Sequence, residues 1–198
     1  NDSTPNNIAG MASLCGLNIV ALTDHNTCKN CPAFFTAAKR YGIIPVAGME
    51  LTTAEDIHVV CLFETLEAAM EFDGFVDTQR IKIKNRTDIF GDQLILDGED
   101  NLVSVEENFL SNATALSVEA VPDAVKKFGG VCYPAHIDRQ ANGIIAVLGT
   151  FPETPRFSCA EFRDSENIAE YSSRYACGRG IEYIFSSYLR ITKAESLI

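Results

Sequence analysis

The chain has 198 residues, of which 46% are hydrophobic and 22% charged, and its formal net charge is −11. These values are typical of one globular domain with a substantial core. The acidity argues against a nucleic-acid polymer as partner, because such binding normally requires a basic surface. No apolar run approaches the roughly 20 residues that span a bilayer. We therefore expect a cytoplasmic protein without a membrane partner.

Helices and short apolar strands alternate along the chain. Pro5 follows the potential N-cap Thr4 and predicts a helix that begins there. The predicted helices span 5–14, 31–41, 66–75 and 117–128. The predicted strands span 18–22, 43–47, 57–63, 131–135, 158–162 and 181–185. Strands that alternate with helices indicate a parallel sheet, either open or closed into a barrel.

A less regular region occupies residues 77–112. Two short apolar runs flank the sequence Asp-Gly-Glu-Asp at 97–100, which predicts a β-hairpin. We interpret 77–112 as an insertion within a single domain that spans 1–198. Its basic residues are interpreted either as a solvated edge strand or as contacts to an anionic substrate; they are Arg80, Lys82, Lys84 and Arg86.

Seven cysteines are present, an odd number, and several lie inside apolar stretches. Buried free thiols explain this pattern better than a disulfide framework does. Cys28 and Cys31 form a C-x-x-C, for which structural zinc, redox chemistry and packing at a helix start are the alternatives. No second pair with zinc-finger spacing follows, so packing is favoured.

The three histidines all lie beside predicted strands. His25 follows the first strand in "TDH", His136 follows a later strand in "PAHID", and His58 begins the strand "HVVCLF". Asp24 and Glu50 also come directly after strands. Because the ends of parallel strands meet at one edge, we expect Asp24, His25, Glu50 and His136 to converge there. Imidazole and carboxylate ligands suit Zn, Mn or Fe. Any one of these histidines taken alone is more often an ordinary core or surface residue, and it is their common position beside strands that favours a metal site.

Four motifs, "ALTDHN", "GMELTT", "HVVCLF" and "YPAHID", together resemble the PHP superfamily, named for polymerase and histidinol phosphatase domains. In detail the chain is similar to its metal-dependent phosphoesterases. The resemblance implies an α/β fold, a distorted (β/α)7 barrel, here with the β-hairpin insertion. It also implies two or three divalent metal ions (Mn, Zn or Fe) and hydrolysis of a small phosphorylated substrate. Position by position, it implies His25, Glu50, His58 and His136 as metal ligands, with Glu50 bridging two ions.

Three further residues are candidates for catalysis. Asp24 fits the family pattern either as a ligand or as a group that orients a ligand histidine. Asp138 and Arg139 follow His136 in "HIDR", and they are candidates for supporting that ligand and for contacting phosphate, which the arginine fork suits. A surface ion pair with Asp138 or another acid is the alternative role for Arg139. Glu161, at the end of "SCAEF", is another candidate at the same edge.

Two ligand motifs of the family have no counterpart in this sequence. The family pattern places an H-x-H before Asn1 and an Asp-x-His between Ser187 and Tyr188. We expect both segments to be omitted from this sequence and not deleted in nature. A natural loss of both would instead indicate a catalytically degraded PHP module with a binding or regulatory role.

Overall fold

The computed structural model describes residues 3–175 and 182–185. The helices are α1 Pro5–Leu14, α2 Cys31–Arg40, α3 Leu66–Gln79, α4 Thr87–Phe90, α5 Val121–Lys127, α6 Ile144–Leu148 and α7 Ile168–Arg174, with a 3-10 helix η1 at Ser165–Asn167. The strands are β1 Ile19–His25, β2 Ile44–Thr52, β3 His58–Phe63, β4 Leu94–Leu96, β5 Leu102–Val105, β6 Gly130–Pro134, β7 Cys159–Phe162 and β8 Glu182–Phe185. Among these described residues, no helix is long and apolar enough to cross a membrane.

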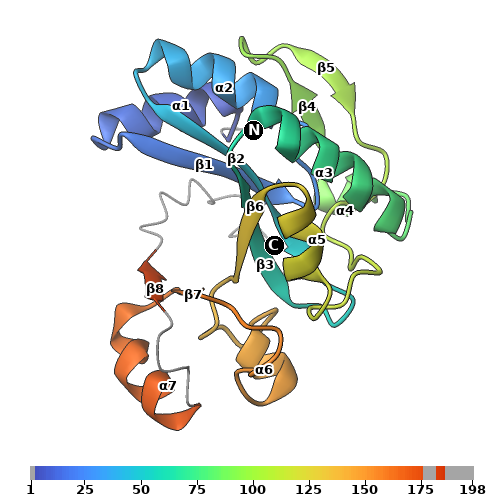
Figure 1. Ribbon diagram of the computed structural model, residues 1–198. Coiled ribbons are helices and arrows are strands. Elements are labelled where there is room, and N and C mark those ends of the chain that lie inside the picture. Colours follow the sequence, from blue (N-terminus) through green and yellow to red (C-terminus); the bar gives the residue numbers. More distant parts are fainter. Residues whose placement is uncertain (1–2, 176–181, 186–198) are drawn as a thin grey trace.

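The main sheet has four strands in the order β1-β2-β3-β6 (Figure 1). β1 and β2 are parallel, whereas β3 runs antiparallel to both β2 and β6. The start of β3 therefore lies at the same end of the sheet as the ends of β1, β2 and β6. Glycine at position 48 allows β2 and β3 to approach closely, because an added Cβ there would lie 2.5 Å from a backbone oxygen of β3.

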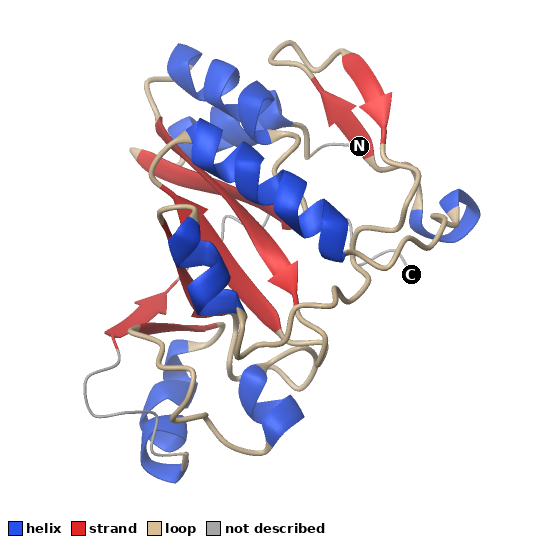
Figure 2. Cartoon of the chain, turned by 45° about the vertical axis from the view of Figure 1, so that its right-hand side comes forward, coloured by secondary structure: helices blue, strands red, loops and turns tan. Residues whose placement is uncertain are grey.

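Helices cover one face of this sheet (Figure 2). α2 and α3 pack on β2, α5 packs on β6, and α1 packs against α2. The core between the layers contains the fully buried rings of Phe34 and Phe72. On the sheet itself Ile19, Ile44 and Val131 are each at least 60% exposed.

Local capping explains where several helices begin. The Thr4 side chain accepts a hydrogen bond from the backbone N–H of Asn7, and Pro5 occupies the first turn of α1, as the sequence predicts. Thr65 caps α3 in the same way. The helix predicted at 117–128 begins later, at Val121, because Ser117 caps a preceding turn instead.

The sequence at 97–100 forms the predicted hairpin, in which β4 and β5 pair antiparallel. The Asp97 carboxylate accepts backbone hydrogen bonds within the turn. The Asp100 carboxylate accepts hydrogen bonds from the Thr4 hydroxyl and from the Asn6 backbone at the start of α1, which fastens the hairpin to the first helix. The interpretation of 77–112 as an insertion stays a prediction.

The mixed α/β fold is confirmed, but the direction of one strand was predicted wrongly. The alternating pattern indicated parallel strands, and β3 is antiparallel. The reason lies in the connection at 53–57, because a parallel crossover needs a dozen or more residues. β7 and β8 form a separate parallel pair. The described residues form no closed barrel, so the distorted (β/α)7 barrel stays a prediction.

Candidate metal centre

The sheet register brings the predicted ligands together. In the parallel pair β1–β2, His25 lies directly opposite Glu50. In the antiparallel pair β2–β3, Thr52 lies opposite His58, so Glu50 and His58 project from the same face of neighbouring strands. On the other side of β3, the backbone N–H of Ala135 bonds to the carbonyl of His58, which places His136 at the same end of the sheet.

Three donor atoms form a compact triangle. His58 Nδ1 lies 2.9 Å and His136 Nε2 lies 3.1 Å from the same oxygen, Oε1 of Glu50. The two nitrogens are 3.2 Å apart. His25 is looser, with Nε2 3.9 Å from Glu50 Oε2. Ligand atoms of His25, Glu50 and His58 nevertheless all lie within 4.8 Å of one another.

This triangle fits a small divalent ion. A tetrahedral ion with nitrogen and oxygen ligands at about 2.0–2.1 Å keeps neighbouring donor atoms about 3.3 Å apart. The three sides of the triangle, 2.9, 3.1 and 3.2 Å, are close to that value. The donor set of imidazoles and one carboxylate also matches zinc, manganese or iron.

Glu50 is held in its charged form. Burial of this side chain, 8% exposed, opposes ionisation and raises its pKa. Hydrogen bonds from His136 and His58 and the nearby His25 outweigh that effect, so the pKa of Glu50 lies below its ordinary value. A carboxylate that stays ionised while buried among imidazoles is well suited to hold a cation.

His136 is fully buried in a strained backbone conformation. Its φ is +30°, in the left-handed region that residues other than glycine rarely adopt. Its carbonyl accepts a hydrogen bond from the Arg139 backbone in the following turn. Its Nδ1 is buried without a hydrogen-bond partner among the described residues. Strain of this kind clusters at functional sites.

Asp24 is not part of the triangle, because it precedes His25 in β1 and its side chain projects from the opposite face of that strand. It is half-buried, and its carboxylate accepts a hydrogen bond from the Asn30 side chain. Burial raises the pKa of Asp24, while that hydrogen bond and the charge of His25 act in the opposite direction. The contact with Asn30 joins β1 to the start of α2, and the role of Asp24 as a ligand or as an orienting group stays a prediction.

The sequence analysis missed the residues that anchor the loop after His25. Asn26 is 1% exposed and donates from its amide to the carbonyls of Leu110 and Asn112. Asp73 of α3 accepts hydrogen bonds from the Thr27 hydroxyl and the Cys28 backbone. Asn26 has a positive φ, and asparagine is one of the few residue types that tolerate this backbone conformation. The sequence could have indicated this property but not the contacts.

The C-x-x-C cysteines belong to the core. Cys28 and Cys31 are each 1% exposed, and both thiols donate to the carbonyl of Gly48. The hydrogen bond with Cys31 raises the pKa of the Cys28 thiol, and burial raises it further. The structure therefore places these cysteines in packing roles at the start of α2.

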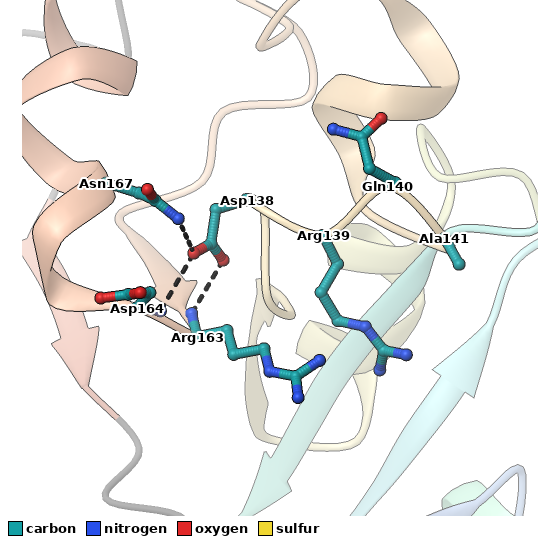
Figure 3. Close-up of a pocket in the computed structure, with 7 residues that line it drawn as sticks. All are labelled: Asp138, Arg139, Gln140, Ala141, Arg163, Asp164 and Asn167. Carbon is teal, nitrogen blue, oxygen red and sulfur yellow. Dashed lines mark hydrogen bonds between the residues drawn. The ribbon is translucent and has the colours of Figure 1, made fainter.

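Asp138 does not pair with Arg139. Its carboxylate accepts hydrogen bonds from the backbone N–H groups of Arg163 and Asp164 and from the Asn167 side chain, at 2.8 to 3.0 Å (Figure 3). Asp138 thus fastens the loop after β6 to the segment after β7. These residues line an open cleft of about 560 Å³ together with Arg139.

Arg163 is a second residue that the sequence analysis missed. It follows β7 directly, so the rule that located His25 and His136 beside strand ends could have found it. Glu161, two residues earlier, is 1% exposed within β7, and its carbonyl accepts a hydrogen bond from the Ile137 backbone. The junction of Ser187 and Tyr188, where an Asp-x-His was expected, lies outside the described residues.

Several solved structures share this fold. An amidohydrolase from Chromobacterium violaceum, solved with sulfate and no metal, aligns with a TM-score of 0.53 at 16% identity, over 94% of this chain and 84% of that one. The lesion-specific endonuclease Q from Pyrococcus furiosus aligns with a TM-score of 0.51 at 17% identity, over 91% of this chain and 42% of that one. A proposed metal-dependent phosphoesterase from Bifidobacterium adolescentis gives 0.46 at 17% identity, over 86% and 68%. At these identities the likeness shows the fold alone. No curated protein matches the sequence.

One of these structures corrects the expectation about nucleic acid. The net charge of −11 argued against a nucleic-acid partner, and that exclusion was wrong. The Pyrococcus furiosus protein that shares the fold is a lesion-specific endonuclease, so the fold is compatible with a nucleic-acid substrate. The physical reason is that net charge sums over the whole surface, whereas phosphate contacts depend on local charge.

The sequence profile of the PHP domain matches residues 2–126, which is more than half of the chain. The match includes β1, β2 and β3, and with them His25, Glu50 and His58. The motif "YPAHID" with His136 lies beyond the matched residues. The resemblance to the PHP superfamily is confirmed, and the chain belongs to the PHP domain family.

Proposed function

We propose that this protein is a metal-dependent phosphoesterase with His25, Glu50, His58 and His136 as ligands of two or three divalent ions. Manganese, zinc and iron are the candidate metals. The substrate is a phosphate ester, and we propose a small phosphorylated molecule. The site belongs to a single PHP-like domain, 1–198, that carries 77–112 as an insertion.

One observation carries this proposal. Three potential ligand atoms, from strand β2, from strand β3 and from His136 just beyond β6, lie 2.9 to 3.2 Å from one another. A cluster of this kind can form by chance around a buried ion pair. Membership of a family with metal-dependent hydrolases supports the functional interpretation over the structural one.

The chain's own residues have separate roles in this proposal. Bound divalent ions would supply Lewis-acid stabilisation of the phosphoryl group and acidify a water molecule. Glu50 and the histidines would hold the ions in place. Asp24 would orient the His25 loop through Asn30, and Arg139 would contact the phosphate with its guanidinium fork.

The test combines metal content with turnover. Purified protein is loaded with manganese, and bound metal and hydrolysis of p-nitrophenyl phosphate are measured for wild type, Glu50→Gln and His136→Ala. Both variants are expected to lose metal and more than about 100-fold in activity, beyond the 10–100-fold cost typical of changes around a ligand. Glu64→Gln is the matched control, because Glu64 is exposed at the other end of β3.

Two results would contradict the proposal. Full retention of metal in both variants would mean that the cluster is not the metal site. Metal binding without turnover of any phosphate ester would instead favour a degraded binding or regulatory module. A phosphodiester and a duplex with an abasic lesion belong in the substrate panel, since endonuclease Q acts on DNA.

A further inference from the structure

Two side chains of β2, Glu50 and Thr52, lie on the face of the sheet that carries the candidate metal centre. Side chains two residues apart in a strand project from the same face. His25 of β1 lies opposite Glu50, and His58 of β3 lies opposite Thr52. Thr52 is therefore a direct neighbour of a proposed ligand, although it was not among the candidate residues.

The rings of His25 and His58 lean toward each other above this end of β2. β1 and β3 flank β2 in the sheet (Figure 1), so their backbones are about 10 Å apart, twice the spacing of neighbouring strands. The ring centroids of the two histidines are nevertheless 5.0 Å apart. The imidazoles thus lie over the end of β2, where Thr52 is 0% exposed.

The polar groups of the Thr52 backbone are all bonded, whereas its hydroxyl is not. The N–H donates to Asn26 Oδ1 at 2.8 Å, and the carbonyl accepts from the N–H and the hydroxyl of Thr114 at 3.0 and 2.8 Å. Oγ1 of Thr52 is buried and has no hydrogen-bond partner among the described residues. Such buried groups are few in native proteins, and each requires an explanation.

His58 has the complementary requirement. Its Nδ1 faces the cluster, 2.9 Å from Glu50 Oε1, and its Nε2 makes no hydrogen bond within the described part of the chain. An imidazole that binds a metal ion through one nitrogen carries its proton on the other and almost always donates that N–H to an oxygen. Cβ atoms of directly opposite residues are about 4.5–5.5 Å apart, which is within reach of a hydroxyl and an imidazole.

We propose that Thr52 is a positioning residue of the metal centre, whose hydroxyl accepts a hydrogen bond from Nε2–H of His58 when Nδ1 holds a divalent ion. This bond fixes the tautomer and the orientation of the ring, and it makes the imidazole a stronger ligand. The role depends on the proposed metal centre but not on a phosphate ester as substrate. In the metal-free protein the hydroxyl stays unpaired, so there it lowers stability.

Zinc affinity and metal-free stability together test this role. Competition with a chromophoric chelator measures zinc binding, and thermal unfolding of metal-free protein measures stability. Valine has the shape of threonine without the hydroxyl, so we expect Thr52→Val to bind zinc about tenfold or more weakly. Its metal-free form should unfold at or above the midpoint of wild type, because an unpaired buried hydroxyl has been removed.

Two further variants complete the comparison. Thr52→Ser keeps the hydroxyl and should bind zinc within about threefold of wild type. Thr36→Val is the control, because Thr36 is exposed in α2 and its hydroxyl bonds to the Pro32 carbonyl. It should change zinc affinity by less than about twofold.

The outcomes separate this role from the proposed function. Equal zinc affinities of wild type and Thr52→Val, or equal losses in Thr52→Val and Thr52→Ser, would overturn the role of Thr52 alone. A lower midpoint for metal-free Thr52→Val would also overturn it, because the hydroxyl would then have a partner without metal. A wild type that binds no zinc would refute the metal centre and this role together, whereas zinc binding without turnover refutes the phosphoesterase proposal alone.

Nitrogen NMR of the histidine rings in zinc-loaded protein tests the partner of the hydroxyl. The ring proton of His58 should reside on Nε2, and its exchange with solvent should be slow in wild type and faster in Thr52→Val. An N–H that exchanges at the same rate in both proteins, or no proton on Nε2 in wild type, would overturn the assignment of His58 as the partner.

Discussion

Asn26, next to the proposed ligand His25, connects three segments of the chain. Its Nδ2 donates to the carbonyl oxygens of Leu110 at 2.6 Å and Asn112 at 2.8 Å, and its Oδ1 accepts from the Thr52 backbone at 2.8 Å. The side chain is 1% exposed, and the backbone φ is +50°. Replacement by alanine removes all three hydrogen bonds and leaves a Cβ in the left-handed region without the local polar contacts that asparagine makes there.

The expected loss of stability follows from these contacts. Each hydrogen bond contributes about 1 kcal/mol net, and the left-handed conformation costs an alanine about 1 kcal/mol. Asn26→Ala should therefore lower the free energy of unfolding by about 4 kcal/mol, a large part of the 5–15 kcal/mol typical of a domain. Asn26→Gly loses the same hydrogen bonds but tolerates the backbone, so we expect about 3 kcal/mol.

Urea denaturation followed by circular dichroism measures both variants against wild type. A loss below about 1 kcal/mol for Asn26→Ala would refute the reasoning, since it would mean that the three contacts stabilise nothing net. If Asn26→Gly were less stable than Asn26→Ala, only the cost assigned to the left-handed backbone at position 26 would be contradicted.

Three further predictions concern the rest of the fold. Gly48→Ala should destabilise the fold by about 1–3 kcal/mol, because the added methyl group overpacks against β3. Gly74 is exposed in α3 with open space around it, so Gly74→Ala should stabilise the fold by up to about 1 kcal/mol. Thermal unfolding should show a lower midpoint temperature for the first variant and a higher one for the second. Burial works against ionisation of Glu106, but Lys29, the Asn108 backbone and Arg80 lower its pKa to about 2. The stabilisation that ionised Glu106 provides is complete above the unfolded pKa of 4.5 and is lost as the pH falls toward 2. Wild type should therefore lose about 1–2 kcal/mol of unfolding free energy between pH 6 and pH 2.5 through this group, and Glu106→Gln should lack that loss. Iodoacetamide at pH 8 should label exposed Cys15 readily and leave buried Cys28 unmodified in the folded protein, and rapid labelling of Cys28 would contradict the packing role.

The order and limits of most elements could be predicted from sequence because local signals define them. Thr4 and Pro5 mark the start of α1, and the pair Asp97-Gly98 marks the hairpin. Strand ends were less accurate. β2 continues to Thr52, beyond the predicted end at 47, because its second half is buried and pairs with β1 and β3, and sequence pattern alone does not show that pairing.

The candidate site was predicted as a set of residues but not as an arrangement. Three histidines and Glu50 were selected by their positions beside strands, and the structure brings them together. Arg163 follows β7 and could have been found by the rule of strand ends. Asn26 belongs to the motif "ALTDHN", but its role as an anchor was missed because its contacts come from segments far away in the chain. Contacts of this range depend on tertiary structure, which local patterns do not encode.

The direction of β3 determines whether His58 can belong to the site. Five steps of about 3.3 Å separate His58 from Phe63 at the other end of the strand. In a parallel sheet His58 would lie roughly 17 Å from the strand ends that carry Glu50 and His136. The short connection at 53–57 forces the antiparallel turn, and the same turn brings His58 Nδ1 to 2.9 Å from Glu50. Insertion of a long flexible segment into this connection would therefore be expected to reduce metal binding through His58 before it unfolds the sheet.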